Sequence, residues 1–444
     1  MIILLPLIYF ALCILLIQRV KLLHIAEFNP AVSSGLFTLK IIAGLALWFI
    51  YSYHYTLRNT SDAFKYFDDA LVLHKTLATN PTHYWQMLTG YNDTAADLTP
   101  YYQQMYNWVK PWNYGLYNDN RIIIRANALC MLLSNGNYFV HIVVFNFVGY
   151  VGLLYLYNFF RVWCAKKLQS LLIVIAVFLT PSMLFWNSGV LKEPLLLISL
   201  GVMLYNFYSA LCTPFTQAHV IKIGIVILCA YALLHLKVYL LPCVLVLMVL
   251  MSIEKYIGKY SLKLIFPACV VIVLVIIVGI QLLLPHYNLL EILRQKQFDF
   301  NNMALTYKAG SYIALPTYNG NALSLLTLAP KAIYTTLFMP TFSYCTSAMM
   351  GINLAENWVM IVLFIYLLFY FDRPSQIQRY RLFSAVLFVG CLATIIGIST
   401  PVIGAIVRYK IPLLPFVFII LFSCISTYSP LIKFIETWQI KLRS

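Results

Sequence analysis

Three aspartates within eight positions are the residues of this sequence best suited to acid–base chemistry. Asp62, Asp68 and Asp69 lie in the stretch Ser61-Asp-Ala-Phe-Lys-Tyr-Phe-Asp-Asp69, which follows an apolar segment. A carboxylate can take a proton from a hydroxyl group as a general base, or hold a divalent cation beside a phosphate. On a helix, Asp62 and Asp69 share one face, and Asp68 lies about 100° away. These aspartates are the candidate catalytic residues, and the plainer alternative is a solvated helix face.

Side chains suited to phosphate binding lie in three later segments, each at the end of an apolar run. An arginine can bind a phosphate through two parallel hydrogen bonds, and a lysine adds a point charge. Ionisable groups this close to a membrane usually face a cavity, although helix capping or snorkelling also explains them. Before Lys192, the residues Asn187, Ser188 and Gly189 are expected to start a helix whose free N–H groups help to bind the anion. The candidate substrate-binding residues are Lys192, Glu193, His235, Lys237, Arg408, Tyr409 and Lys410.

The composition indicates that membrane helices position these residues. Of the 444 residues, 62% are hydrophobic and 10% are charged, whereas a soluble domain carries about 25% charged residues. The net charge of +16 is explained by basic residues that flank membrane helices, so no nucleic-acid partner is expected. The ten cysteines include no Cys-x-x-Cys pair, so neither a disulfide framework nor a cysteine metal site is expected.

Long apolar runs predict the fold class. A helix of about 17–25 apolar residues can cross the hydrocarbon core of a membrane. The sequence predicts an all-α polytopic membrane protein with about eleven transmembrane helices, and hence with its termini on opposite sides. The runs 220–235 and 238–252 are either two short spans or one broken helix. The predicted spans are 1–18, 36–53, 137–160, 169–186, 193–211, 220–235, 238–252, 263–285, 354–371, 382–399 and 411–428.

The distribution of charge predicts the orientation. Sixteen of the thirty Lys and Arg residues, including Lys40, fall in short segments that we assign to the cytoplasm. Ten of the fourteen Asp and Glu residues fall in segments assigned to the outside. Because positive residues favour the cytoplasmic side, the N-terminus is expected outside and the C-terminus inside. The candidate site residues then all face the outer side.

Five parts follow from this topology, and two of them are large extracytoplasmic loops. The first loop carries the aspartates and is rich in Tyr and Trp, which favour interfacial helices and also suit a sugar-binding surface. The second loop contains a candidate re-entrant hairpin near 326–344. The parts are 1–53 with two helices, 54–136 as the first loop, 137–285 with helices three to eight, 286–353 as the second loop, and 354–444 with three helices and a short cytoplasmic tail.

Three motifs resemble parts of known bacterial membrane proteins. The stretch from Ser61 to Asp69 is similar to the acidic loop entry of the GT-C superfamily of polyprenyl-phosphate-sugar-dependent glycosyltransferases. The sequence Gly404-Ala-Ile-Val-Arg-Tyr-Lys-Ile-Pro-Leu-Leu-Pro415 resembles the Arg-Tyr-x-x-Pro-x-x-Pro element of many of those enzymes. Phe185-Trp-Asn-Ser-Gly-Val-Leu-Lys-Glu193 resembles a turn in membrane proteins of polysaccharide gene clusters.

The GT-C resemblance implies sugar transfer from an undecaprenyl-phosphate carrier at the outer face of the bacterial inner membrane, in some members with a divalent cation. It implies that Asp62, Asp68 or Asp69 is the base, and that Arg408 and Lys410 contact the phosphate. The expected partners are thus a polyprenyl-phosphate-linked sugar and membrane lipid. Two hydrophobic segments precede the acidic loop here, whereas the family usually has one.

Three functions fit these observations. The first is a membrane glycosyltransferase in cell-surface polysaccharide assembly. The second is a polymerase that joins lipid-linked O-antigen or exopolysaccharide repeat units by similar chemistry. The third is a non-catalytic transporter or flippase for a lipid-linked sugar, which would place charged residues along a path open to both sides. The candidates gather on one side, which favours an enzyme.

Overall fold

The computed structural model describes residues 3–53, 58–110, 118–164, 169–257 and 288–443. Every regular element in these ranges is a helix. Within them, β-type pairing consists of two isolated bridges, Tyr312 with Val402 and Phe371 with Ile425. The expected all-α class is confirmed for this part of the chain.

Six helices of the described residues are long and apolar enough to cross a membrane. A seventh candidate forms if α18 (Ile403–Tyr409) and α19 (Leu414–Ser423), which meet at an angle of 65°, are counted as one broken span. The chain is therefore a multi-pass membrane protein. The six helices are α2 (Pro30–Tyr53), α7 (Tyr138–Trp163), α10 (Lys192–Cys212), α11 (Gln217–Leu236), α16 (Ala348–Tyr370) and α17 (Gln376–Ser399).

The remaining predicted spans are shorter, interrupted or outside the described residues. The run 169–186 is interrupted because Thr180 is extended and Pro181 begins a new helix. The run 238–252 belongs to a helix of its own, separate from α11. The run 263–285 lies outside the described residues, so the count of eleven stays a prediction. The elements concerned are α1 (Leu4–Arg19), α8 (Ser170–Val174), the π-helical turn Ile175–Leu179, α9 (Pro181–Trp186) and α12 (Leu240–Ile257).

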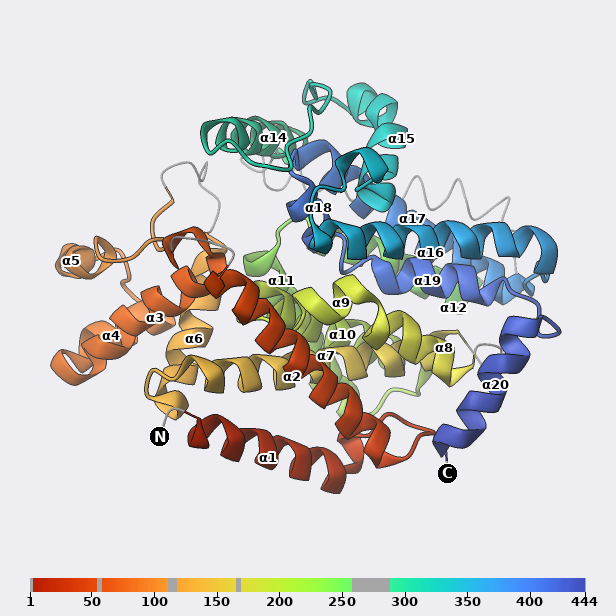
Figure 1. The fold of residues 1–444 in the computed structure, drawn as a ribbon, viewed down its shortest axis with the longest axis horizontal. Helices are drawn as coiled ribbons and strands as arrows, with labels where there is room; N and C mark the ends of the chain where they lie inside the picture. Colours follow the sequence, from red (N-terminus) through yellow and green to blue (C-terminus); the bar gives the residue numbers. More distant parts are fainter. Residues whose placement is uncertain (1–2, 54–57, 111–117, 165–168, 258–287, 444) are drawn as a thin grey trace.

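Short helices gather at one end of the long ones. Figure 1 shows α7, α10, α16 and α17 running across the picture, with the short helices at the left and α20 (Pro430–Arg443) at the right. Helix α1 starts at the left, where the Tyr9 hydroxyl donates to the Leu133 carbonyl at 3.1 Å. We call the two ends the α3 end and the α20 end. The short helices are α3 (Asp62–Thr79), α4 (Pro81–Thr89), α5 (Thr99–Tyr102) and α6 (Asn120–Ser134).

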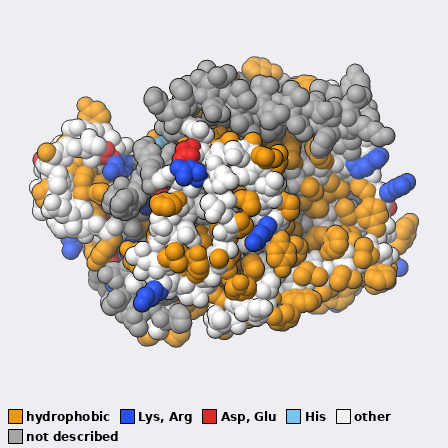
Figure 2. Space-filling view, turned by 90° about the horizontal axis from the view of Figure 1, so that it is seen from above, with side chains coloured by type: hydrophobic (Ala, Val, Ile, Leu, Met, Phe, Trp, Pro, Cys, Tyr) orange, Lys and Arg blue, Asp and Glu red, His pale blue; other side chains and the backbone are white. Residues whose placement is uncertain are grey.

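Hydrophobic side chains cover much of the outer surface between these two ends. Ile227 and Leu228 of α11 are 64% and 67% exposed, and Leu368 of α16 is 71% exposed. Figure 2 shows hydrophobic side chains over much of the lower right of the visible face, with Lys and Arg at the right-hand edge. An apolar surface of this extent is unfavourable in water and favourable in lipid.

The second predicted loop folds into α14 (Leu289–Thr306), α15 (Ala322–Phe338) and a 3-10 turn at Phe342–Tyr344. The apolar piece 326–344 is therefore one helix followed by a short turn. Helix α15 packs against α17, where the Thr336 hydroxyl donates to the Ala393 carbonyl at 2.7 Å.

Candidate functional site

Arg408 joins two acidic residues from distant parts of the chain. Its Nη1 donates to Asp62 Oδ2 at 2.9 Å, and its Nε donates to Glu193 Oε1 at 2.6 Å. Asp62 is the first residue of α3, Glu193 is the second residue of α10, and Arg408 is near the end of α18. The structure thus brings together one predicted aspartate and two of the predicted substrate-binding residues.

A second ion-pair group lies beside the first. Lys192 Nζ donates to Asp119 Oδ2 at 2.6 Å, and Lys110 Nζ donates to Asp119 Oδ1 at 2.5 Å. Lys192 is only 4% exposed. The sequence prediction missed Lys110 and Asp119, because they stand alone in an aromatic loop and no spacing links them to Lys192.

Two further lysines lie over tyrosine rings. Lys237 Nζ is 3.6 Å from the centre of the Tyr409 ring and 5.8 Å from that of Tyr239. Lys296 Nζ, from α14, is 5.4 Å from the centre of the same Tyr239 ring. These distances are those of cation–π contacts. The sequence prediction included Lys237 and Tyr409 but missed Lys296, which lies in a helix of the second loop with no nearby motif.

We call these eight ionisable residues the charged cluster. Burial alone would raise the pKa of Asp62, but Arg408, Lys192 and Lys65 together outweigh it and bring that pKa below its ordinary value. Burial likewise acts to raise the pKa of Asp119, and Lys192, Lys110 and Lys237 hold it far below its ordinary value. Both aspartates are therefore ionised at neutral pH. The charged cluster consists of Asp62, Lys110, Asp119, Lys192, Glu193, Lys237, Lys296 and Arg408.

A small hollow, with about 270 Å³ of space that is partly open to solvent, lies at the charged cluster. Charged, apolar and tyrosine side chains all contribute to its wall. The hollow therefore offers both polar and apolar contacts to a ligand that reaches it. Its wall is formed by Glu193, Lys237, Arg408, Tyr239, Tyr409, Leu196, Leu240 and Pro412.

The turn 187–191, which leads into α10, is recessed from the α3 end. A Cβ atom at Gly44 would meet the Ser188 carbonyl oxygen at 2.4 Å, and one at Gly189 would meet the Leu47 side chain at 3.0 Å. Gly44 and Leu47 lie nine and six residues before the end of α2 at Tyr53, which is about 9–14 Å along a helix. The start of α10, with Lys192 and Glu193, is therefore set inward from the end of α2.

The recessed turn corrects two predictions. Asn187 and Ser188 are fully buried, and α10 begins only at Lys192, so the predicted N–H groups at 187–189 are not open to an anion. Lys40 was assigned to the cytoplasmic side, near the start of the predicted span 36–53, but Pro30 starts α2 six residues earlier and Lys40 lies buried in the interior of the helix. There Lys40 Nζ donates to the Asn187 carbonyl at 2.7 Å and to Ser188 Oγ at 3.2 Å.

Asp68 and Asp69 lie outside the charged cluster. Asp68 accepts two hydrogen bonds from Arg58, at 2.7 and 2.9 Å, in a partly exposed pair. Asp69 is fully buried and accepts from the backbone N–H groups of Tyr106 and Asn107, at 2.7 and 2.8 Å. Burial raises the pKa of Asp69 to about 6. These contacts give Asp68 and Asp69 roles in holding residues 58–107 together.

Lys410 and His235 also bond elsewhere. Lys410 is fully buried, donates to Asn357 Oδ1 at 2.9 Å and lies 3.8 Å from Glu356, so it ties the chain after α18 to α16. The His235 ring, in the last turn of α11, bonds to the Tyr231 carbonyl at 2.8 Å. Three neighbouring residues, 408–410, were predicted to bind substrate. Arg408 and Tyr409 line the hollow, and Lys410 does not.

The charged cluster does not have the donor arrangement of a metal site. Asp62 and Glu193 are both bonded to Arg408, and Asp119 is bonded to two lysines. Across the residues that the structure describes, no three His, Cys, Asp or Glu side chains come together as metal ligands. A divalent cation therefore has no evident set of ligands here, and we assign no step to one.

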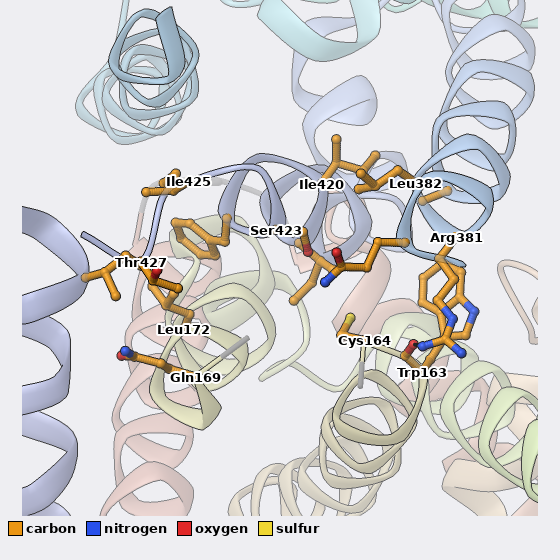
Figure 3. Close-up of a pocket in the computed structure, with 15 residues that line it drawn as sticks. Trp163, Cys164, Gln169, Leu172, Arg381, Leu382, Ile420, Ser423, Ile425 and Thr427 are labelled. Atoms are coloured by element: carbon orange, nitrogen blue, oxygen red, sulfur yellow. Dashed lines mark hydrogen bonds between the residues drawn. The ribbon is translucent and has the colours of Figure 1, made fainter. Parts of the chain in front are cut away.

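A larger hollow, with about 620 Å³ of space partly open to solvent, lies toward the α20 end. Figure 3 shows Trp163 and Arg381 together on one side of it and Gln169, Leu172 and Thr427 on the other. Arg381 donates to Glu254 at 2.8 Å and to the Trp163 carbonyl. These bonds satisfy the arginine within the protein, and they join the start of α17 to the ends of α12 and α7.

Comparisons with protein-family models, with characterised protein sequences and with solved structures find no match to this chain.

Proposed function

We propose that the protein is a membrane glycosyltransferase that takes a sugar from a polyprenyl-phosphate-linked donor in cell-surface polysaccharide assembly. The observation that carries the proposal is the meeting of Asp62 with Arg408, beside Lys192 and Lys237, at a hollow that also has an apolar wall. A lipid-linked phosphosugar has a phosphate that matches the charged part and a tail that matches the apolar part.

In this proposal the donor phosphate displaces the carboxylates from Arg408 and binds Arg408 and Lys192. The acceptor hydroxyl oxygen forms a bond to the anomeric carbon of the sugar. The bond from that carbon to the phosphate oxygen breaks, and the lipid phosphate leaves with the electron pair. Asp62 takes the proton of the acceptor hydroxyl and later passes it to water.

The pairing of Asp62 with Arg408 suits this sequence of events. In the resting site, Arg408 helps to keep the pKa of Asp62 below its ordinary value, so Asp62 is ionised but weakly basic. A phosphate bound to Arg408 neutralises part of the guanidinium charge, and the pKa of Asp62 then rises. The carboxylate therefore becomes a stronger base once the donor is in place.

A repeat-unit polymerase is the second candidate, and one observation favours it. Lys237 and Lys296 add positive charge beyond what a single phosphate at Arg408 requires. Polymerases of this kind act on a lipid-linked saccharide by the same bond changes, so Asp62 and Arg408 would keep the same roles.

We further propose that the α3 end faces outward from the bacterial inner membrane and that the chain crosses it eleven times. Basic residues support this orientation, because Lys433, Lys441 and Arg443 lie on α20 and positive residues favour the cytoplasmic side. The charged cluster would then meet donors that have already been moved to the outer leaflet.

Binding of a C55 polyprenyl phosphate to the purified chain in detergent tests the proposal. Arg408→Lys loses one of two charge-assisted hydrogen bonds, each worth about 1.5–3 kcal/mol, so we expect binding to weaken at least about tenfold. Arg58→Lys is the matched control, because Arg58 also pairs with an aspartate of α3 but is 54% exposed on its side chain. Equal affinities for the two variants, or no binding by the unaltered chain, would contradict the proposal.

A further inference from the structure

Lys237 and Lys296 differ from the other cations of the charged cluster. Arg408, Lys192 and Lys110 each bond to a carboxylate. Among the described residues, Lys237 and Lys296 contact aromatic rings and make no ion pair. Both face the single ring of Tyr239 although they come from different segments, one between α11 and α12 and the other in α14.

The charged cluster carries an excess of two positive charges. It has five cations (Arg408, Lys192, Lys110, Lys237 and Lys296) and three carboxylates (Asp62, Glu193 and Asp119), and five minus three is two. Burial lowers the pKa of Lys296 to about 8, and Asp119 partly opposes that shift. A partly buried cluster with a net positive charge favours binding of an anion.

We propose that Lys237 and Lys296 form a second anion subsite, and that the ligand of this site carries two linked phosphates. The inference rests on the proposed function, since it takes Arg408 as the first phosphate subsite. Lys237 and Arg408 line the same hollow, so one diphosphate can contact both. The apolar wall at Leu196, Leu240 and Pro412 favours a diphosphate that is attached to a lipid.

This second subsite favours a donor that carries a diphosphate over a donor that carries a monophosphate. A donor with a monophosphate would leave Lys237 or Lys296 without a partner, whereas a lipid diphosphate would satisfy both. A saccharide linked to a lipid diphosphate loses the diphosphate as its leaving group, with the electron pair, when the acceptor oxygen bonds to the anomeric carbon. The bonds that form and break are otherwise those of the proposed transfer reaction. A diphosphate donor favours a repeat-unit polymerase over a transferase that uses a monophosphate donor.

Four probes test the inference on the full chain in detergent: inorganic phosphate, methylene diphosphonate, C55 polyprenyl phosphate and C55 polyprenyl diphosphate. We expect each diphosphate to bind about tenfold more tightly than its monophosphate counterpart, which is the size of one charge-assisted contact. Lys296→Gln should remove most of this preference and leave monophosphate affinity within about twofold. Lys308→Gln is the matched control, because it removes an exposed lysine just beyond the same helix.

The outcomes separate the two proposals. Equal binding of mono- and diphosphate, or an unchanged preference in Lys296→Gln, overturns the second subsite and leaves the proposed function standing. Failure of both C55 lipids to bind overturns the proposed function itself. If methylene diphosphonate binds as tightly as the lipid diphosphate, the subsite is supported and its ligand is a soluble diphosphate. If Lys296→Gln does not fold, Lys237→Gln provides the same test, because Lys237 contacts the same Tyr239 ring.

Discussion

Asp62→Asn should separate catalysis from stability. The substitution keeps the shape of the side chain and removes its charge. Arg408 keeps its bond to Glu193, and the Asp62 side chain is 45% exposed. Solvent screens such a pair, so we expect the folded state to lose about 1 kcal/mol or less. In the proposed mechanism the same change removes the general base, which is worth about 10²–10⁴ in rate.

The assay measures both quantities. Transfer of labelled sugar from endogenous lipid carriers to polymer is followed in isolated membranes that contain each variant, and thermal unfolding is measured on the purified chains. Asp68→Asn is the matched control, because Asp68 lies on the same helix and pairs with an exposed arginine outside the charged cluster. Its transfer rate and unfolding midpoint should both stay close to those of the unaltered chain.

Two results would refute the reasoning. Transfer by Asp62→Asn within about threefold of the unaltered rate would show that this carboxylate is not the base. Equal losses in Asp62→Asn and Asp68→Asn would show that the effect belongs to the helix and its loop, and the special position of Asp62 beside Arg408 would then have no catalytic meaning.

Two further predictions concern the parts that hold the site. Gly44→Ala should destabilise the fold by about 1–3 kcal/mol, because its Cβ atom would meet the Ser188 carbonyl oxygen. Gly35→Ala on the same helix is the control, because a Cβ atom there has nothing within 4 Å. Thermal unfolding of the two variants checks this prediction, and equal unfolding midpoints would contradict it. Burial raises the pKa of Asp69 from 3.8 to about 6, so the folded state binds its proton more tightly and stability from this group should fall as the pH rises from about 4 to about 6. The full change is about 3 kcal/mol, and an Asp69→Asn chain with the same pH dependence as the unaltered one would disprove it.

Local sequence patterns predicted helices better than they predicted contacts. Apolar runs located α2, α7, α10, α11, α16 and α17, because a span needs a long run of apolar residues. The starts were less accurate. Pro30 and the five residues after it are not an apolar run, yet they form the first turns of α2. Lys40 therefore lies in the interior of the helix and not near its end, where the sequence placed it.

The site residues likewise divide into those that a local motif predicted and those that only packing brings to the site. Asp62 and Arg408 were found because each belongs to a short motif at the end of a span. Lys410 follows Arg408 by two positions, about 200° around a helix, so it faces a different part of the protein. Lys296 and Asp119 were missed, since only the packing of α14 and α6 brings them to the cluster and no local pattern records that contact.

If the proposed function and orientation hold, the recessed start of α10 would make the membrane voltage part of ligand binding. A phosphate that moved from the end of α2 to Lys192 along the membrane normal would cross about 10 Å of a hydrocarbon layer about 30 Å thick. A full crossing is worth about 2.3 kcal/mol per charge per 100 mV, so this journey is worth about 0.8 kcal/mol per charge. With the α3 end outward, a cell interior that is negative opposes entry of the anion. The occupancy of the site would then rise when the membrane is depolarised, and a doubly charged ligand would respond more strongly than a singly charged one.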